Sequence, residues 1–260
     1  MNITTLLDKV YFAPRLKKID FYANRAGELQ HRVLDRLVRM AENTEWGKKY
    51  DYKSIHTYED FRNRLPIQTY EEVKPYVERL RAGEQNLLWP SEIRWFAKSS
   101  GTTNDKSKFL PVSKEALNDT HYQGGKDAVA LYLGQNPDSR FFSGQGLILG
   151  GSHSPNLNSR HGLVGDLSAI LIQNIHPLVN CVRVPSKKIA LMSDFEKKIE
   201  AIANSAVSKD VTSLSGVPSW MLVLIKRILE KTGKQSLEEI WPNLEVFFHG
   251  GVAFTPYREQ

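Results

Sequence analysis

Hydroxyl, glycine and lysine residues gather between positions 96 and 111, where the sequence reads FAKSSGTTNDKSKFLP. Four hydroxyl residues surround one glycine and two lysines follow them: Ser99, Ser100, Gly101, Thr102, Thr103, Lys106 and Lys108. Backbone amides of a glycine-containing turn form an anion-binding concavity, hydroxyl groups donate to phosphate oxygens, and an ammonium group neutralises charge on a leaving group. This stretch therefore has the chemistry to hold a polyphosphate.

An exposed hairpin turn explains the same composition equally well, because these residues are also good turn formers. The P-loop pattern G-x-x-x-x-G-K-[ST] does not occur in the sequence. The stretch leads into a strand expected at 108–112 rather than into a helix, so we do not expect a helix dipole to bind the phosphates. Residue types alone leave both interpretations open.

Short apolar runs separated by helical segments must position this stretch. We expect strands at 93–97, 108–112, 146–150, 168–172, 211–214 and 244–248. Helices are expected to begin at Ser113, at the capping box formed by Ser193 and Glu196, and after Pro218. Strands that alternate with helices of this length predict an α/β fold with a mostly parallel sheet flanked by helices.

The first 98 residues are expected to form an N-terminal helical layer. Asn24 is a candidate cap for an amphipathic helix that faces the core. The apolar residues of that face are Leu29, Val33, Leu37, Met40 and Ala41. Capping boxes at Thr57 and Thr69 predict two further helices, and the second should end near Gly83. We therefore expect two parts, a helical layer at 1–98 and an α/β portion at 99–260.

Composition excludes several classes of protein. With 41 % hydrophobic and 25 % charged residues, the 260-residue chain has a globular composition rather than a collagen-like or disordered one. Its single cysteine, Cys181, cannot form an intrachain disulfide, so we expect a reducing compartment, the cytoplasm. The apolar runs are too short for a bilayer helix or a signal-peptide core, and we expect neither of these nor a membrane partner.

The net charge of +6 is spread along the sequence rather than gathered in a stripe, so we do not expect a nucleic-acid partner. The histidines other than His249 lack the i, i+4 pairing typical of zinc sites, and we assign no metal ligand to the sequence. Glycines at 144, 146 and 150 do not meet the dinucleotide-binding fingerprint, because the third falls one position late.

The string SSGTTNDKSKFLP resembles the phosphate-binding signature of acyl-adenylate-forming enzymes, and specifically that of the auxin-responsive (Gretchen Hagen) acyl acid amido synthetase family, which is related to firefly luciferase. Three later strings are also similar to this family and its bacterial members: GDLSAILIQN at 165–174, SLSGVPSWM at 213–221 and PNLEVFFHGGVAFTPY at 242–257. The resemblance implies a ligase that uses ATP and magnesium to activate a carboxylic acid as an acyl-adenylate. It also implies transfer of the acyl group to an amine, as in amino acid conjugation.

By this resemblance, the α/β portion binds ATP. The residues that would hold its β- and γ-phosphates are Ser99, Ser100, Gly101, Thr102 and Thr103, and Lys108 would be the catalytic lysine that closes the motif. Many family members have glycine at the position of Asp105. An acid beside a triphosphate is unfavourable unless it points outward or pairs with Lys106.

The resemblance also places residues around adenine and the acyl group. Gly250, Gly251 and Val252 would border adenine, because two glycines after a buried strand let a flat ring lie against the backbone. A plain β-turn is the alternative. The neighbouring His249 could contact the acyl-phosphate region or could be structural. Tyr122, Val217 and Trp220 lie where related enzymes form the acyl pocket, although large aromatic residues more often belong to the core.

Motifs that follow the Gly-Gly turn in the family are missing from the sequence, which ends at Gln260. In the family, these parts supply a magnesium ligand, a group for the ribose hydroxyls and a lysine placed by a mobile C-terminal domain. We therefore expect an N-terminal fragment that is inactive by itself and that completes its site with the missing C-terminal half. The alternatives are a nucleotide- or acyl-binding module without catalysis and a basic nucleic-acid binder. The identity of the acid and the amine, and the use of a thioester route, are left open.

Overall fold

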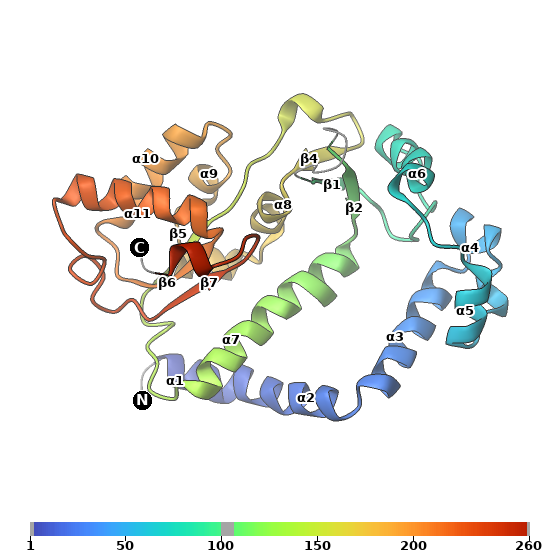
Figure 1. Ribbon diagram of the computed structural model, residues 1–260, viewed down its shortest axis with the longest axis horizontal. Coiled ribbons are helices and arrows are strands. Elements are labelled where there is room, and N and C mark those ends of the chain that lie inside the picture. The colour runs from blue at the N-terminus through green and yellow to red at the C-terminus, as the bar shows by residue number, and fades with distance from the viewer. Residues whose placement is uncertain (1–2, 100–106, 259–260) are drawn as a thin grey trace. The chain divides into compact units, whose positions relative to one another are not determined.

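The computed structural model describes residues 3–99 and 107–258 (Figure 1). Two units of tertiary structure make up the chain, and each is assembled from separate segments. The first unit contains the segment that ends at Ala13, Ala130–His153 and the segment that begins at Asp166, and the second contains Pro14–Val129 and Ser154–Gly165. The boundary expected after residue 98 falls within the second unit, and as a division into domains it stays a prediction.

A parallel sheet with the strand order β5-β3-β6-β7 forms the centre of the first unit (Figure 1). Its strands are β3 (Gln145–Leu149), β5 (Arg183–Val184), β6 (Val211–Gly216) and β7 (Val246–His249). The register places Leu147 beside Val184 in one neighbouring strand and beside Leu214 in the other, so these side chains share one face. The predicted α/β fold with a parallel sheet is therefore confirmed.

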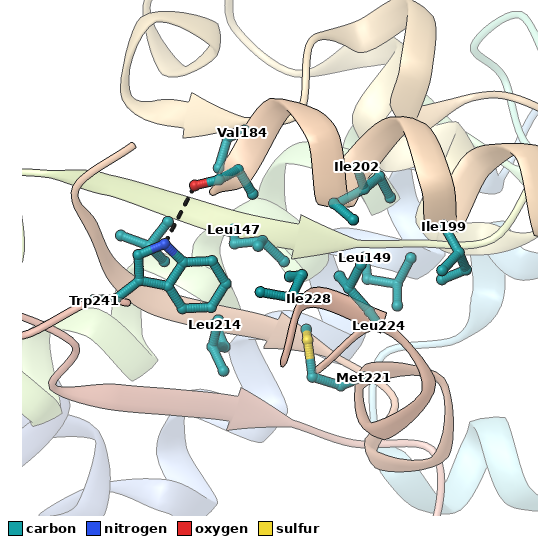
Figure 2. Packing of buried hydrophobic residues seen from close by; sticks show 13 residues of the cluster. Leu147, Leu149, Val184, Ile199, Ile202, Leu214, Met221, Leu224, Ile228 and Trp241 are labelled. Carbon is teal, nitrogen blue, oxygen red and sulfur yellow. Dashed lines mark hydrogen bonds between the residues drawn. The ribbon is translucent and has the colours of Figure 1, made fainter. Parts of the chain in front are cut away.

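Helices α10 (Phe195–Ala206) and α11 (Pro218–Thr232) pack on that face of the sheet. Residues of the strands, of both helices and of the segment before β7 form one core, of which Figure 2 labels Leu147, Leu149, Val184, Ile199, Ile202, Leu214, Met221, Leu224, Ile228 and Trp241. The indole Nε1 of Trp241 donates to the carbonyl oxygen of Ala206 at 3.2 Å, which satisfies the polar group of this buried side chain. Burial of each large apolar side chain contributes about 1.5–3 kcal/mol, so this core holds the sheet in place.

Residues 168–172, which were expected to form a strand, lie in helix α8 (Leu167–Asn174). The prediction is wrong because a short apolar run suits a buried strand and a buried helix equally well. Helix α10 is capped by Asp194 rather than by Ser193, and the Asp194 carboxylate accepts from the Lys197 backbone N–H at 3.0 Å. The remaining helical segments of this unit are α1 (Ile3–Leu7), η1 (Asp8–Phe12), η5 (Pro177–Val182), α9 (Lys187–Ala190) and η6 (Thr255–Tyr257).

The second unit contains a smaller mixed sheet with the strand order β2-β1-β4. Its strands are β1 (Trp95–Lys98), β2 (Phe109–Val112) and β4 (Leu163–Gly165). Strand β1 pairs antiparallel with β2 and parallel with β4. Phe96 and Val164 lie side by side in this sheet, and both are buried in a core that also contains Val77 and Leu80.

Local capping signals determine several helices of the second unit. Both predicted capping boxes are present, Thr57 with Asp60 and Thr69 with Glu72. The helices and helical turns are α3 (Ala26–Ala41), α4 (Glu45–Lys49), η2 (Tyr52–Ser54), α5 (Tyr58–Arg64), α6 (Tyr70–Ala82), η3 (Ala116–Tyr122) and η4 (Pro155–Leu157). Helices α2 (Ala13–Asn24) and α7 (Gln123–Gln135) each span a boundary between the units. Within the described part of the chain, no helix combines the length and the apolar composition that crossing a bilayer requires.

Helix α3 differs from its prediction. Asn24 is the last residue of α2 rather than a cap of α3, and its side-chain amide donates to the Asp20 carbonyl oxygen at 2.9 Å. Of the apolar face expected to meet the core, only Ala41 is buried, whereas Val33, Leu37 and Met40 are exposed. The prediction of a core-facing stripe is therefore wrong for those three residues, because helical spacing identifies an apolar face without identifying what covers it.

Candidate functional site

The carboxyl ends of β3, β6 and β7 lie at one edge of the parallel sheet of the first unit. The chain leaves β3 toward β5 on one side, whereas it leaves β6 toward β7 on the other side. Such a reversal is a topological switch point, and open α/β sheets bind ligands outside the carboxyl ends of their strands at this position. We call the turns that follow these strands, at 150–152, 216–218 and 249–251, the switch-point edge.

The turn after β6 lies against the turn after β7. Val217 is the N-cap of α11, and its carbonyl oxygen accepts from the Met221 N–H at 2.9 Å. Gly251 has a φ of 85°, a conformation that favours glycine, and a Cβ at this position would lie 3.3 Å from Cγ2 of Val217. Two of the predicted binding residues, Val217 and Gly251, are thus brought together.

The other predicted residues around the turn after β7 border open space or are exposed. Among the described residues other than its two chain neighbours, none has a heavy atom within 4 Å of a Cβ added at Gly250, and Val252 is exposed. His249 stacks on Phe254 with ring centroids 4.3 Å apart and lies 5.4 Å from the ring of Phe247. These ring contacts favour the structural role for His249.

The predicted acyl-pocket residues divide between the units. Trp220 is 37 % exposed and its ring packs edge-on against Phe195 at 6.0 Å, so it is not a core residue. Tyr122 is half-buried in the second unit, and burial raises the pKa of its hydroxyl group. Because Tyr122 lies in one unit and Val217 and Trp220 lie in the other, a shared acyl pocket stays a prediction.

The base of the predicted phosphate-binding stretch lies in the second unit, at the open ends of β1 and β2. The Ser99 N–H donates to the Lys108 carbonyl oxygen at 2.9 Å, and the Lys108 N–H donates to the Ser99 hydroxyl at 3.1 Å. The Lys108 ammonium lies 5.5 Å from the centre of the Tyr70 ring, whose hydroxyl accepts from the Phe109 N–H at 2.9 Å. As expected, the stretch leads into a strand.

Most of the predicted phosphate-binding residues lie in the segment 100–106. Ser100, Gly101, Thr102 and Thr103 lie outside the described residues, as do Asp105 and Lys106. Their role therefore stays a prediction. Ser99 and Lys108, which flank them, are joined by two hydrogen bonds.

The turn after β3 is held by residues that were not predicted from the sequence. Lys198 of α10 is 1 % exposed, and its ammonium donates to the carbonyl oxygens of Gly150 and Gly151 and to the hydroxyl of Ser152. Burial lowers the pKa of Lys198 to about 8, although the charge of Asp166 opposes this shift. The sequence contains a signal for the burial of Lys198, because this lysine precedes Ile202 by one helical turn and so lies on the apolar face of an amphipathic helix.

Comparison with known proteins identifies the family. The model of the "GH3 family N-terminal domain" matches residues 15–260. An indole-3-acetic acid-amido synthetase, GH3.2 of Arabidopsis thaliana, is 30 % identical over 103 residues, which is 39 % of this chain and 19 % of the relative. A jasmonoyl–L-amino acid synthetase, JAR4 of Nicotiana attenuata, is 26 % identical over 106 residues, which is 40 % of this chain and 18 % of the relative.

A solved structure has the same fold. The GH3.15 acyl acid amido synthetase superposes with a TM-score of 0.72 at 16 % sequence identity, and the alignment covers 94 % of this chain and 53 % of that one. The chain thus spans about half the length of this solved relative. Because the model of the family's N-terminal domain matches the sequence from residue 15 to residue 260, the chain belongs to the GH3 family.

Proposed function

We propose that the chain is the N-terminal part of an ATP-dependent ligase that activates a carboxylic acid as an acyl-adenylate and transfers the acyl group to an amine. The observation that carries this proposal is the pairing of Ser99 with Lys108 at the base of a hydroxyl-rich stretch, in a chain of the GH3 family. The relatives named above are amido synthetases for indole-3-acetic acid and for jasmonoyl conjugates. The proposed substrates are accordingly a small carboxylic acid and an amino acid.

In this proposal Lys108 acts on the pyrophosphate leaving group. Attack of the substrate carboxylate on the α-phosphate breaks the bond to the β-phosphate, and negative charge develops on the departing pyrophosphate. An ammonium group that is already in place stabilises that charge. The hairpin geometry supports this role, because the Lys108 backbone is held by Ser99 and its ammonium lies over the Tyr70 ring. Ser99, with Ser100, Gly101, Thr102 and Thr103, would bind the β- and γ-phosphates.

The switch-point edge is the proposed site for the rest of the nucleotide and for the acid. Gly250, Gly251 and Val252 border adenine, because glycines carry no side chain that would keep a flat ring from the backbone. Val217 and Trp220 contribute to the acyl pocket, and the partial exposure of Trp220 is consistent with a ligand contact. Tyr122, in the second unit, is a further residue proposed to bind the substrate.

Magnesium binding is proposed to depend on residues beyond this chain. Among residues 3–99 and 107–258, no three His, Cys, Asp or Glu side chains lie close enough together to hold a metal ion. Magnesium in nucleotide sites is usually held by one or two carboxylates together with substrate phosphates and water. No step of the proposed mechanism is assigned to a metal held by the described residues.

Two measurements test the proposal. Calorimetric titration should detect ATP binding to the 260-residue chain, with weaker binding after Lys108→Ala and unchanged binding after Lys114→Ala, which alters an exposed lysine. Acid-dependent exchange of pyrophosphate into ATP should occur only in a protein that also contains the C-terminal half. Robust exchange by the 260 residues alone would contradict the N-terminal-part proposal. ATP binding without exchange in the longer protein would favour a non-catalytic binding module.

A further inference from the structure

The turn after β3 is held by side chains from two other elements of the first unit. The Gly151 N–H donates to the Ser168 hydroxyl at 2.8 Å, and the Ser152 N–H donates to the Asp166 carboxylate at 2.8 Å. The Asp166 N–H donates in return to the Ser152 carbonyl oxygen at 3.0 Å. A Cβ at Gly151 would lie 2.2 Å from an Asp166 carboxylate oxygen, so the turn and Asp166 are in close contact.

Lys198 reaches the same turn from α10. Its Nζ lies 3.1 Å from the Gly150 carbonyl oxygen, 2.9 Å from the Gly151 carbonyl oxygen and 2.9 Å from the Ser152 hydroxyl. An ammonium group has three N–H donors, so these acceptors use all of them. The Ser152 hydroxyl donates onward to the Met192 carbonyl oxygen at 2.7 Å.

Burial of the Lys198 ammonium group carries a desolvation cost that an apolar side chain would not have. This cost is smaller when the ammonium group is hydrogen-bonded, and the three acceptors of the turn offset it for Lys198. A satisfied polar network also favours one arrangement of the groups that it joins. The feature joined here is the backbone of 150–152, at the carboxyl end of β3.

The position of this turn connects it to the candidate site. Leu149 pairs in register with Gly216, and a Cβ at Gly216 would lie 2.8 Å from the Leu149 carbonyl oxygen. The ends of β3 and β6 are therefore in contact at the switch point, and the turn after β6 contacts Gly251 through Val217. Displacement of the turn after β3 would change the surroundings of Gly216 first.

We infer that Lys198 is a positioning residue, which fixes the carbonyl groups of Gly150 and Gly151 so that the turn after β3 forms one side of the ligand site at the switch-point edge. The inference rests on the proposed function for the identity of the ligand, ATP. It assigns no direct ligand contact to Lys198, because the three acceptors in the turn occupy its ammonium.

The test is ATP affinity measured by calorimetry on the 260-residue chain and its variants, at a temperature where circular dichroism shows each to be folded. Lys198→Met removes the three donors with little change in volume. We expect its dissociation constant for ATP to rise by about tenfold or more, since small misplacements of site residues have effects of this size. Hydrogen exchange at the amides of Gly151 and Ser152 should accelerate in the same variant.

Two control variants show whether a loss of ATP affinity comes from the position of the turn, from lower stability of the fold or from the loss of a positive charge. Ile202→Ala removes a fully buried side chain one turn along α10 and should destabilise the fold, while the three hydrogen bonds from Lys198 to the turn are kept. Lys197→Met removes the neighbouring charge from a side chain that is 77 % exposed. Both should keep the wild-type dissociation constant for ATP while folded. Equal weakening by Ile202→Ala and Lys198→Met would overturn the inference, because it would assign the effect to stability alone.

A second variant decides the matter if Lys198→Met does not fold. Ser152→Ala keeps the lysine and removes one of its three acceptors, and we expect a smaller loss of ATP affinity together with faster exchange at 150–152. Wild-type affinity in this variant despite faster exchange would overturn the inference. Failure of the wild-type chain to bind ATP would instead overturn the proposed function, and with it the role of the turn in ATP binding.

Discussion

The two regions proposed to contact the nucleotide are built differently. The turn after β7 follows a parallel sheet whose strands are backed by the buried side chains of α10 and α11. The stretch between Ser99 and Lys108 instead joins two short antiparallel strands, and Leu110 of β2 is 49 % exposed. The first region therefore depends on a core assembled from distant segments. The second depends on backbone hydrogen bonds between residues close in sequence.

The largest expected effect is on the core behind the switch-point edge. Leu224→Ala removes a fully buried side chain of α11, and we expect it to lower the free energy of unfolding by about 2–5 kcal/mol. Leu110→Ala in the hairpin should change it by less than about 0.5 kcal/mol, because that side chain is half-exposed. Urea unfolding followed by circular dichroism measures both, and similar losses would contradict the contrast between the regions.

The second-largest expected effect is on the rate of the proposed reaction rather than on the free energy of unfolding. In a protein that contains the C-terminal half, Lys108→Ala should slow acid-dependent pyrophosphate exchange by about a hundred- to a thousandfold, since such electrostatic contacts contribute about 2.7–4 kcal/mol. Thr120→Ala, outside the hydroxyl-rich stretch, should leave the exchange rate nearly unchanged. A folded Lys108→Ala protein with a normal exchange rate would remove Lys108 from the proposed mechanism.

A smaller effect concerns pH and the buried lysine. The pKa of Lys198 is lowered by burial to about 8, below the value of about 10.4 for a lysine in the unfolded chain. Between these values the unfolded state binds more protons than the folded state, so the free energy of unfolding should rise with pH. We expect a gain on the order of 1 kcal/mol between pH 7 and pH 9. Lys198→Met should lack this contribution in urea titrations, and an identical pH dependence in both proteins would contradict the assigned shift.

The smallest expected effect is on the closure of the hairpin. Ser99→Ala removes the hydroxyl that accepts from the Lys108 N–H, which should cost about 0.5–1.5 kcal/mol of unfolding free energy. Ser99→Thr keeps a hydroxyl group and should retain most of that stability. Equal thermal stability of the Ala and Thr variants would show that this hydrogen bond does not hold the base of the stretch.

Local signals in the sequence were sufficient for the features that depend on neighbouring residues. The capping boxes at Thr57 and Thr69 predicted helices that are present, because their hydrogen bonds join residues three positions apart. The apolar runs near 146–150, 211–214 and 244–248 predicted strands that form the parallel sheet. The family resemblance carried by the stretch from Ser99 onward is also a property of the sequence, and the GH3 family match confirms it.

Tertiary structure decided the features that depend on which distant segment packs against a residue. The run at 168–172 could become a strand or a helix, and helix α8 formed because its buried residues Ala169, Ile170 and Ile172 pack in that conformation. Helices α3 and α10 both carry apolar stripes, yet only α10 buries its stripe against a sheet.

The role of Lys198 illustrates the same limit. Periodicity places this lysine on the apolar face of α10, but its three acceptors come from a turn that lies 46–48 residues earlier in the chain. The sequence by itself determined the family, the strand and helix segments with strong local signals, and the residue types at the candidate site. Only the tertiary structure decided which of those residues meet, because contacts between distant segments depend on strand order and packing rather than on spacing along the chain.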